Sequence, residues 1–136
     1  MVLDPKIYRE EISNLGIEGL NIKVHSVAEA LQLLVELKNI EKTLKKIKYN
    51  IRIDMRSLRK HYLDEIKEVE KPVKVMKVFN KKLDPKKSLK IKKKIVNERE
   101  HRIKPYELLE RLIDDYLWQI DESKKYLQDF IGKKME

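Results

Sequence analysis

The sequence predicts an all-α protein built as a long antiparallel helical hairpin. The first observation is the stretch from Ser26 to Lys71, which contains neither Pro nor Gly and in which apolar residues recur three or four residues apart. The second is the same strict spacing from Tyr106 to Phe130. The third is the content of charged residues, 40%, which leaves little material for a deep spherical core. A rod of packed helices satisfies all three observations.

The two arms of this hairpin have matching lengths. At 1.5 Å per residue, a helix over residues 26–71 is roughly 70 Å long, and one over residues 85–133 is roughly 73 Å long. Two helices alone bury little apolar surface, so we expect a homodimer to complete the core. The chain is then a single elongated helical domain with four parts: an N-terminal cap (1–25), a spine helix (26–71), a tip (72–84) and a return arm (85–133).

The N-terminal cap begins with a short helix. Asp4 and Pro5 are typical of a helix start, and Gly16 is typical of a helix end. After it, residues 17–24 alternate loosely between apolar and polar, which predicts either a short strand or an extended lead-in to the spine.

The spine has clear start and stop signals. Ser26 and Glu29 have the spacing of a capping box, and Pro72 cannot continue a helix. Its apolar seam combines seven- and eleven-residue repeats, which predicts a nearly straight helix with a partner along its whole length. The seam residues are Leu34, Leu37, Ile40, Leu44, Ile47, Ile51, Met55, Leu58, Tyr62, Ile66 and Val69.

The return arm begins at a second Asp-Pro pair, Asp84 and Pro85. Before it, residues 73–79 are mostly apolar and fit either a short strand or two helical turns. Pro105 is expected to kink, break or restart the arm. We expect Leu117, Trp118 and Ile131 to widen its apolar face. The seam of the arm is Ile91, Ile95, Ile103, Tyr106, Leu109, Ile113, Tyr116, Ile120, Ser123, Leu127 and Phe130.

Positive charge is concentrated in the middle of the chain. The formal net charge is +9, and residues 71–104 hold fourteen Lys or Arg against three acidic residues. A surface of this sign favours a polyanion or an acidic protein as partner. We therefore predict phosphate contacts from the tip and the start of the return arm. The residues are Lys74, Lys77, Lys81, Lys82, Lys86, Lys87, Lys90, Lys93 and Lys94.

A basic stripe with one aromatic residue runs beside the seam of the spine. Arg52, Arg56 and Arg59 are the members for which we predict nucleic-acid contacts, through phosphates and stacking on Tyr49. The opposing interpretation is internal neutralisation, because residues 42–59 are expected to face the acidic stretch 97–114. The full stripe is Lys38, Lys42, Lys45, Tyr49, Arg52, Arg56 and Arg59.

These features predict a cytoplasmic, non-catalytic protein that binds DNA or RNA without strong sequence specificity. The alternative is a coiled-coil scaffold that binds an acidic or helical protein. Cysteine is absent, and no phosphate-binding loop, dinucleotide fingerprint or zinc-hydrolase motif is present. We therefore expect no cofactor and no metal site. No apolar run approaches membrane-spanning length, so no membrane partner is expected.

One short pattern suggests a third interpretation. The segment from Arg56 to His61 has the Arg-x4-His spacing and resembles the motif of the HEPN ribonucleases, which are small all-helical proteins. That resemblance implies a dimer in which His61 and Arg56 act on a phosphodiester. It covers six residues, and Ser57 stands where that family usually carries Asn, Asp or His after the arginine.

Overall fold

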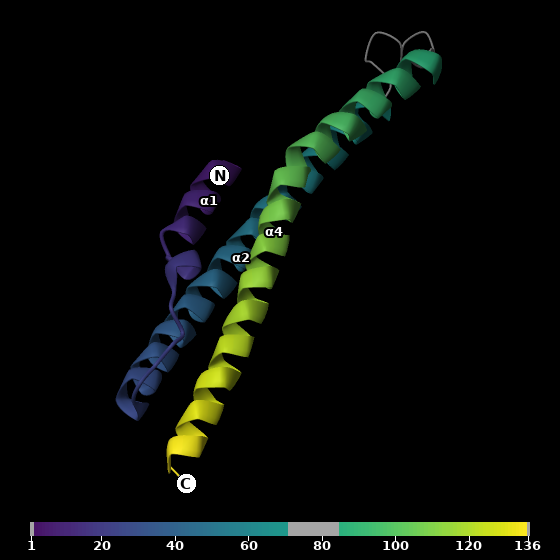
Figure 1. Cartoon of the computed structure of the whole chain (residues 1–136). Helices are drawn as coiled ribbons and strands as arrows, with labels where there is room; N and C mark the ends of the chain where they lie inside the picture. Colours follow the sequence, from purple (N-terminus) through teal and green to yellow (C-terminus); the bar gives the residue numbers. More distant parts are fainter. Residues whose placement is uncertain (1, 71–84, 136) are drawn as a thin grey trace.

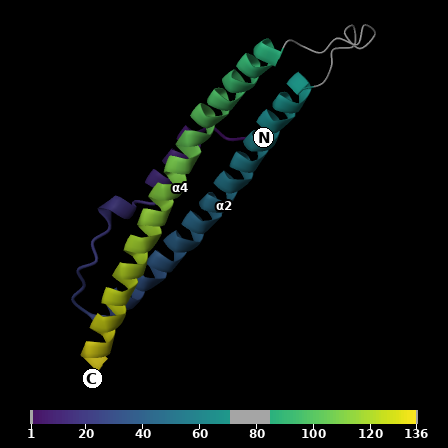
Figure 2. The same cartoon turned by 90° about the vertical axis from the view of Figure 1, so that its right-hand side faces the viewer.

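The structure is a computed structural model and describes residues 2–70 and 85–135. The described part contains three α-helices, α1 (Pro5–Ser13), α2 (Val27–Glu70) and α4 (Pro85–Met135), and one 3-10 turn, η1 (Ile17–Gly19). Helices α2 and α4 run antiparallel and lie side by side, with α1 against their middle (Figures 1 and 2). The prediction of an all-α hairpin with a short N-terminal helix is confirmed.

Local capping fixes where the first two helices begin. The Lys6 N–H donates to Asp4 Oδ1 at 2.9 Å, with Pro5 in the first helical position. At α2, the Glu29 N–H donates to Ser26 Oγ at 3.1 Å. The Glu29 carboxylate accepts in return from the His25 N–H at 2.9 Å, one residue earlier than in a standard capping box. These bonds satisfy backbone donors that the helices leave unpaired.

The core is a single seam between the two long helices. Leu44 and Ile51 of α2 and Ile113 and Leu127 of α4 are completely buried. They are spaced at multiples of seven residues within each helix, as the periodicity predicts. Elsewhere in the expected seam, Ile40, Ile66, Val69, Tyr116 and Phe130 are only partly buried, and Ile91 is exposed.

The two helices are displaced along the hairpin axis relative to the expected register. Glu70, the last residue of α2, pairs with Lys92 at 2.9 Å. Asp114 was expected opposite residue 42 but pairs with Lys48. Residues 85–91 of α4 therefore extend beyond the described end of α2, by roughly two helical turns.

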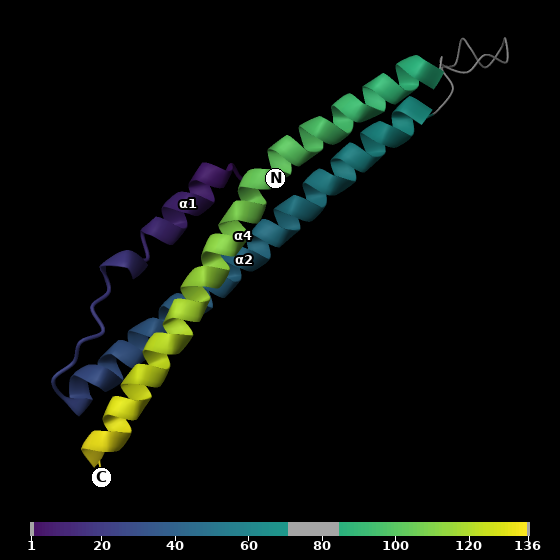
Figure 3. The same cartoon turned by 45° about the vertical axis from the view of Figure 1, so that its right-hand side comes forward.

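Helix α4 continues through Pro105 without a break. Because proline has no N–H, the carbonyl of His101 loses its usual partner one turn earlier. The helix bends part-way along its length (Figure 3). Of the three expectations for this residue, a kink within one continuous helix is the one that the structure matches.

One sequence prediction is wrong, one of two alternatives is excluded, and a third prediction lies outside the described residues. Residues 17–24 form no strand: Gly16 adopts φ 68°, η1 follows, and the chain then runs irregularly to α2. Its apolar residues Ile17, Leu20 and Val24 pack on the hairpin, which explains their alternation without a sheet. Trp118 was expected to widen the core but is 65% exposed. The segment 73–79 is not among the described residues.

A buried carboxylate fastens the N-terminal segment to the hairpin. Asp54 of α2 is 7% exposed and accepts hydrogen bonds from the Tyr8 hydroxyl and, at 3.1 Å, from the Leu3 N–H. The Tyr106 hydroxyl of α4 donates to the Leu3 carbonyl at 2.6 Å. Burial and the hydrogen bond to Asp54 raise the pKa of Tyr8, so its hydroxyl stays protonated and remains a donor. Residues from α1, α2 and α4 thus meet in one polar cluster.

Candidate nucleic-acid interface

The start of α4 carries a cluster of lysines that we call the α4 lysine patch. Lys87, Lys90, Lys93 and Lys94 are exposed and form no ion pair with another described residue, and Lys86 is exposed beside them. The overhang of α4 contributes to this isolation, because the patch lies on residues near or beyond the level of Glu70. Of the acidic residues of the spine that were expected opposite these lysines, Asp64 and Glu65 lie further along the hairpin, and Glu70 pairs with Lys92. The patch therefore keeps most of its charge available.

The predicted tip lysines cannot be placed in the same way. Lys74, Lys77, Lys81 and Lys82 belong to residues 71–84, which the structure does not describe. In sequence they directly precede the α4 lysine patch. They stay predictions.

The basic stripe of the spine divides into a neutralised part and an open part. Arg52 Nε pairs with Glu110 at 3.2 Å, and Arg59 pairs with Glu107 at 3.6 Å. Lys45 pairs with Glu41 at 3.1 Å. Internal neutralisation therefore applies to these three residues. Arg52 and Arg59 remain more than half exposed, so their pairs are weak and a phosphate could exchange with the carboxylates.

Glu41 of α2 pairs with lysines of both long helices. Its carboxylate accepts from Lys124 of α4 at 2.8 Å as well as from Lys45. These hydrogen bonds lower the pKa of Glu41, with the one from Lys124 contributing most. A row of such pairs runs along one flank of the hairpin and joins α2 to α4.

The remaining members of the stripe lie on the side of α2 that points away from α4, together with Lys46, Ile53 and Lys60. Each member lies two residues from a buried or half-buried residue, which places it about 200° around the helix. The cations among these residues form no ion pair with the other described residues. Tyr49, at 65%, and Ile53, at 41%, are exposed among them. We call this set the α2 outward row, and it consists of Lys38, Lys42, Lys46, Tyr49, Ile53, Arg56 and Lys60.

Sequence reasoning found some of this row and missed the rest. Lys38, Lys42, Tyr49 and Arg56 belong to the predicted stripe, but Lys46, Ile53 and Lys60 do not. The signal was available, because a residue two positions from a seam residue points outward on a straight helix. Asp54 was also missed, although a lone acid between Ile51 and Leu58 of the seam indicates a buried polar partner.

The residues of the ribonuclease-like pattern are separated by the helix that carries them. Arg56 and His61 lie five residues apart on the unbroken α2, about 140° around its axis. His61 Nε2 contacts Glu65 Oε1 at 3.0 Å, and its ring packs edge-on against Tyr62. Within one chain, the two side chains do not converge on a common point.

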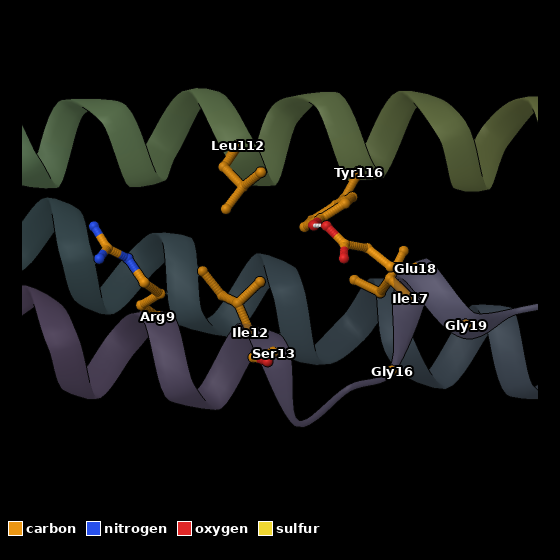
Figure 4. A pocket seen from close by; sticks show the side chains of 9 residues that line it. All are labelled: Arg9, Ile12, Ser13, Gly16, Ile17, Glu18, Gly19, Leu112 and Tyr116. Atoms are coloured by element: carbon orange, nitrogen blue, oxygen red, sulfur yellow. Dashed lines mark hydrogen bonds between the residues drawn. The ribbon is translucent and has the colours of Figure 1, made fainter.

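A shallow pocket lies between α1, η1 and α4, away from these basic surfaces (Figure 4). Arg9 is at one end of it, and Glu18 and Tyr116 are at the other. The Tyr116 hydroxyl donates to Glu18 at 2.8 Å, and this bond raises the pKa of Tyr116. With its one carboxylate so engaged, the pocket offers no acid–base pair. Among the described residues, no group of three or more His, Asp or Glu could hold a metal ion.

Comparison with known proteins adds no further information on function. No protein family model, no curated protein and no solved structure matches this chain. Within residues 2–70 and 85–135, no helix is long and apolar enough to cross a membrane. Any functional assignment therefore depends on the geometry and charge described above.

Proposed function

We propose that the protein binds nucleic acid without catalysis, through contacts to backbone phosphates. The observation that supports this most directly is the α4 lysine patch, where four exposed lysines have no acidic partner among the described residues. Like charges one turn apart, such as Lys90 and Lys94, cost a few tenths of a kcal/mol per pair in an isolated helix. A polyanion relieves this repulsion when it binds.

The mechanism is electrostatic. Each lysine that neutralises a phosphate releases a condensed counterion, so the affinity falls steeply as the salt concentration rises. Lysine offers a mobile point charge and does not hold a base edge in a fixed orientation. The patch contains neither Gln nor Arg, so we expect little discrimination between sequences.

The direct test is a set of fluorescence anisotropy titrations with duplex DNA, single-stranded DNA and structured RNA at several salt concentrations. In the test variant, Lys87, Lys90, Lys93 and Lys94 are changed to Ser. In the control variant, Lys6, Lys23, Lys133 and Lys134 are changed to Ser, which removes the same charge from exposed sites elsewhere. We expect a loss of at least about tenfold in affinity for the test variant only.

Other outcomes of this test separate the alternatives. Absence of binding at low salt would end the nucleic-acid proposal and favour an acidic protein partner. Equal losses in both variants would show that only net charge matters. Cleavage of the RNA that His61→Ala abolishes would favour the ribonuclease alternative.

We also propose that the protein is a homodimer, joined through the part of α4 from Leu108 to Tyr126. Trp118, Leu108 and Tyr126 are 65%, 51% and 48% exposed on the outward side of this helix. Large apolar side chains that are exposed together favour a protein contact. Sedimentation equilibrium tests this with Trp118→Ser, which we expect to be more monomeric than the wild type. Leu31→Ser, at a similarly exposed site on α2, is the control.

A further inference from the structure

The two basic surfaces of the hairpin face in opposite directions. Lys42 and Lys60 of the α2 outward row lie two residues from Leu44 and Leu58, which are buried against the rest of the hairpin. Lys93 of the α4 lysine patch lies in the same way two residues before the buried Ile95. A separation of two residues is about 200° of rotation, so Lys42, Lys60 and Lys93 point away from the partner helix, whereas Lys94, next to Ile95, lies at the side of α4.

The packed helices keep the two surfaces apart. Neighbouring helix axes lie 8–10 Å from each other, and each helix is about 10–12 Å wide with its side chains. The two outward surfaces are therefore about 20 Å apart across the hairpin. The two surfaces are also offset along the hairpin axis. The α2 outward row ends at Lys60, whereas the α4 lysine patch lies near the level of Glu70, which pairs with Lys92. A straight duplex that lies on one surface cannot reach the other.

Each surface has enough free charge to hold a nucleic acid by itself. The α2 outward row contains five cations over 23 residues of helix, from Lys38 to Lys60, which is roughly 33 Å. A duplex of that length presents about 20 phosphates. The acids that neutralise Arg52 and Arg59 lie on the flank of the hairpin and contact none of these five cations.

We propose that a single chain bridges two nucleic-acid segments, one on the α4 lysine patch and one on the α2 outward row. This inference depends on the proposed function and extends it, since it makes the hairpin a rigid spacer between two strands or duplexes. The α2 outward row binds a second polyanionic backbone, because the cations of this row have no acidic partner among the described residues. Tyr49 adds a surface on which an unpaired base can stack.

The test is a capture assay with two duplexes. A short biotinylated duplex is fixed on beads, the protein is bound to it, and a second fluorescent duplex is added. One variant changes Lys42, Lys46, Arg56 and Lys60 to Ser, and the other changes Lys87, Lys90, Lys93 and Lys94 to Ser. Every protein in this assay, the wild-type reference included, also carries Trp118→Ser, so that the proposed homodimer does not supply two copies of one surface. Anisotropy with a single duplex measures simple binding in parallel, and circular dichroism confirms that each variant is helical.

We expect each variant to keep binding a single duplex, with an affinity lowered by at most about a hundredfold. Capture of the second duplex should fall to the level of beads without protein in both variants. The charge-matched control variant with Lys6, Lys23, Lys133 and Lys134 changed to Ser should capture normally.

Three results would overturn the inference. Capture that survives in the α2 variant would mean that two copies of the chain bridge through one surface each. Complete loss of simple binding in that variant would make the α2 row the sole interface. Binding of the wild type to the beads without any capture of a second duplex would show that only one surface is active. Failure of the proposed function is distinct, because the wild type would then not bind the beads at all.

Discussion

Asp54 is the one charged side chain buried within the described part of the chain. A carboxylate in such a place needs hydrogen-bond donors, and it has two, the Tyr8 hydroxyl and the Leu3 N–H. Both belong to the N-terminal segment. Asp54 therefore determines where the N-terminal segment docks. The other buried residues of the helix that carries Asp54 are apolar or aromatic.

Removing one donor should expose this dependence. We predict that Tyr8→Phe lowers the free energy of unfolding by about 1–3 kcal/mol, because a buried carboxylate loses one of its two partners. Urea denaturation followed by circular dichroism measures the change. Tyr126→Phe removes a hydroxyl from a side chain that is 48% exposed and should stay within about 0.5 kcal/mol of the wild type. Equal stability of Tyr8→Phe and the wild type would contradict this role for Asp54.

Glu41 gives a prediction that depends on pH. Lys124 and Lys45 hold its pKa below the ordinary value of 4.5 in the folded state. The stabilisation is therefore complete above that ordinary value and disappears as the pH falls through the lower folded value. We predict that Glu41→Gln costs about 1–2 kcal/mol at neutral pH.

This difference between Glu41→Gln and the wild type should shrink as the pH falls below 4.5. Urea denaturation at a series of pH values gives both curves. Glu36→Gln, on an exposed part of α2, serves as control. A difference that grows towards acid would show the wrong sign and reject the assignment.

At the scale of the elements, Pro105 is the proline that lies in the interior of a described helix. It leaves the His101 carbonyl without its helical donor, in a helix that otherwise continues for 51 residues. We predict that Pro105→Ala raises the free energy of unfolding by about 1–3 kcal/mol. Pro5→Ala is the control, because proline in the first helical turn removes no hydrogen bond. A less stable Pro105→Ala would mean that the bend itself is needed for packing.

The α2 outward row leads to a prediction about the type of nucleic acid. Tyr49 is 65% exposed among cations, and stacking of one base on an aromatic ring contributes about 1–3 kcal/mol. Tyr49→Ala should therefore weaken single-stranded DNA by about fivefold to a hundredfold and duplex DNA much less. Anisotropy titrations measure both. An equal loss for the two substrates would indicate that Tyr49 does not stack on bases.

The elements that the sequence predicted best are those with local signals. Asp4, Ser26 and Pro85 mark helix starts through backbone chemistry that does not depend on tertiary contacts. Residues 17–24 were predicted less well, because apolar alternation also arises in an irregular chain packed on a core. Trp118 was misplaced for a geometric reason, since it lies two residues before the buried Ile120 and so points to the opposite side.

For the whole molecule, the ion pairs that could be predicted at the interface depended on the register between α2 and α4. The length of the tip does not determine how far one helix extends past the other. The pairing of Glu70 with Lys92 could therefore not be predicted. The exposed lysines of α4 follow from composition alone. The neutralisation of Arg52 by Glu110 and of Arg59 by Glu107 needed the true register, because a shift of a few residues exchanges every partner across the hairpin.

The central claim is that cations on the outward sides of a rigid hairpin bind phosphate backbones. The most direct test is the salt dependence of duplex binding for the wild type and for the variant with Lys87, Lys90, Lys93 and Lys94 changed to Ser. We predict a linear fall of the logarithm of the association constant with that of the salt concentration, with a slope of about −0.9 for each phosphate contact. The variant should have a slope less negative by about 3–4. A wild-type affinity that does not change with salt, or identical slopes for the two proteins, would contradict the claim.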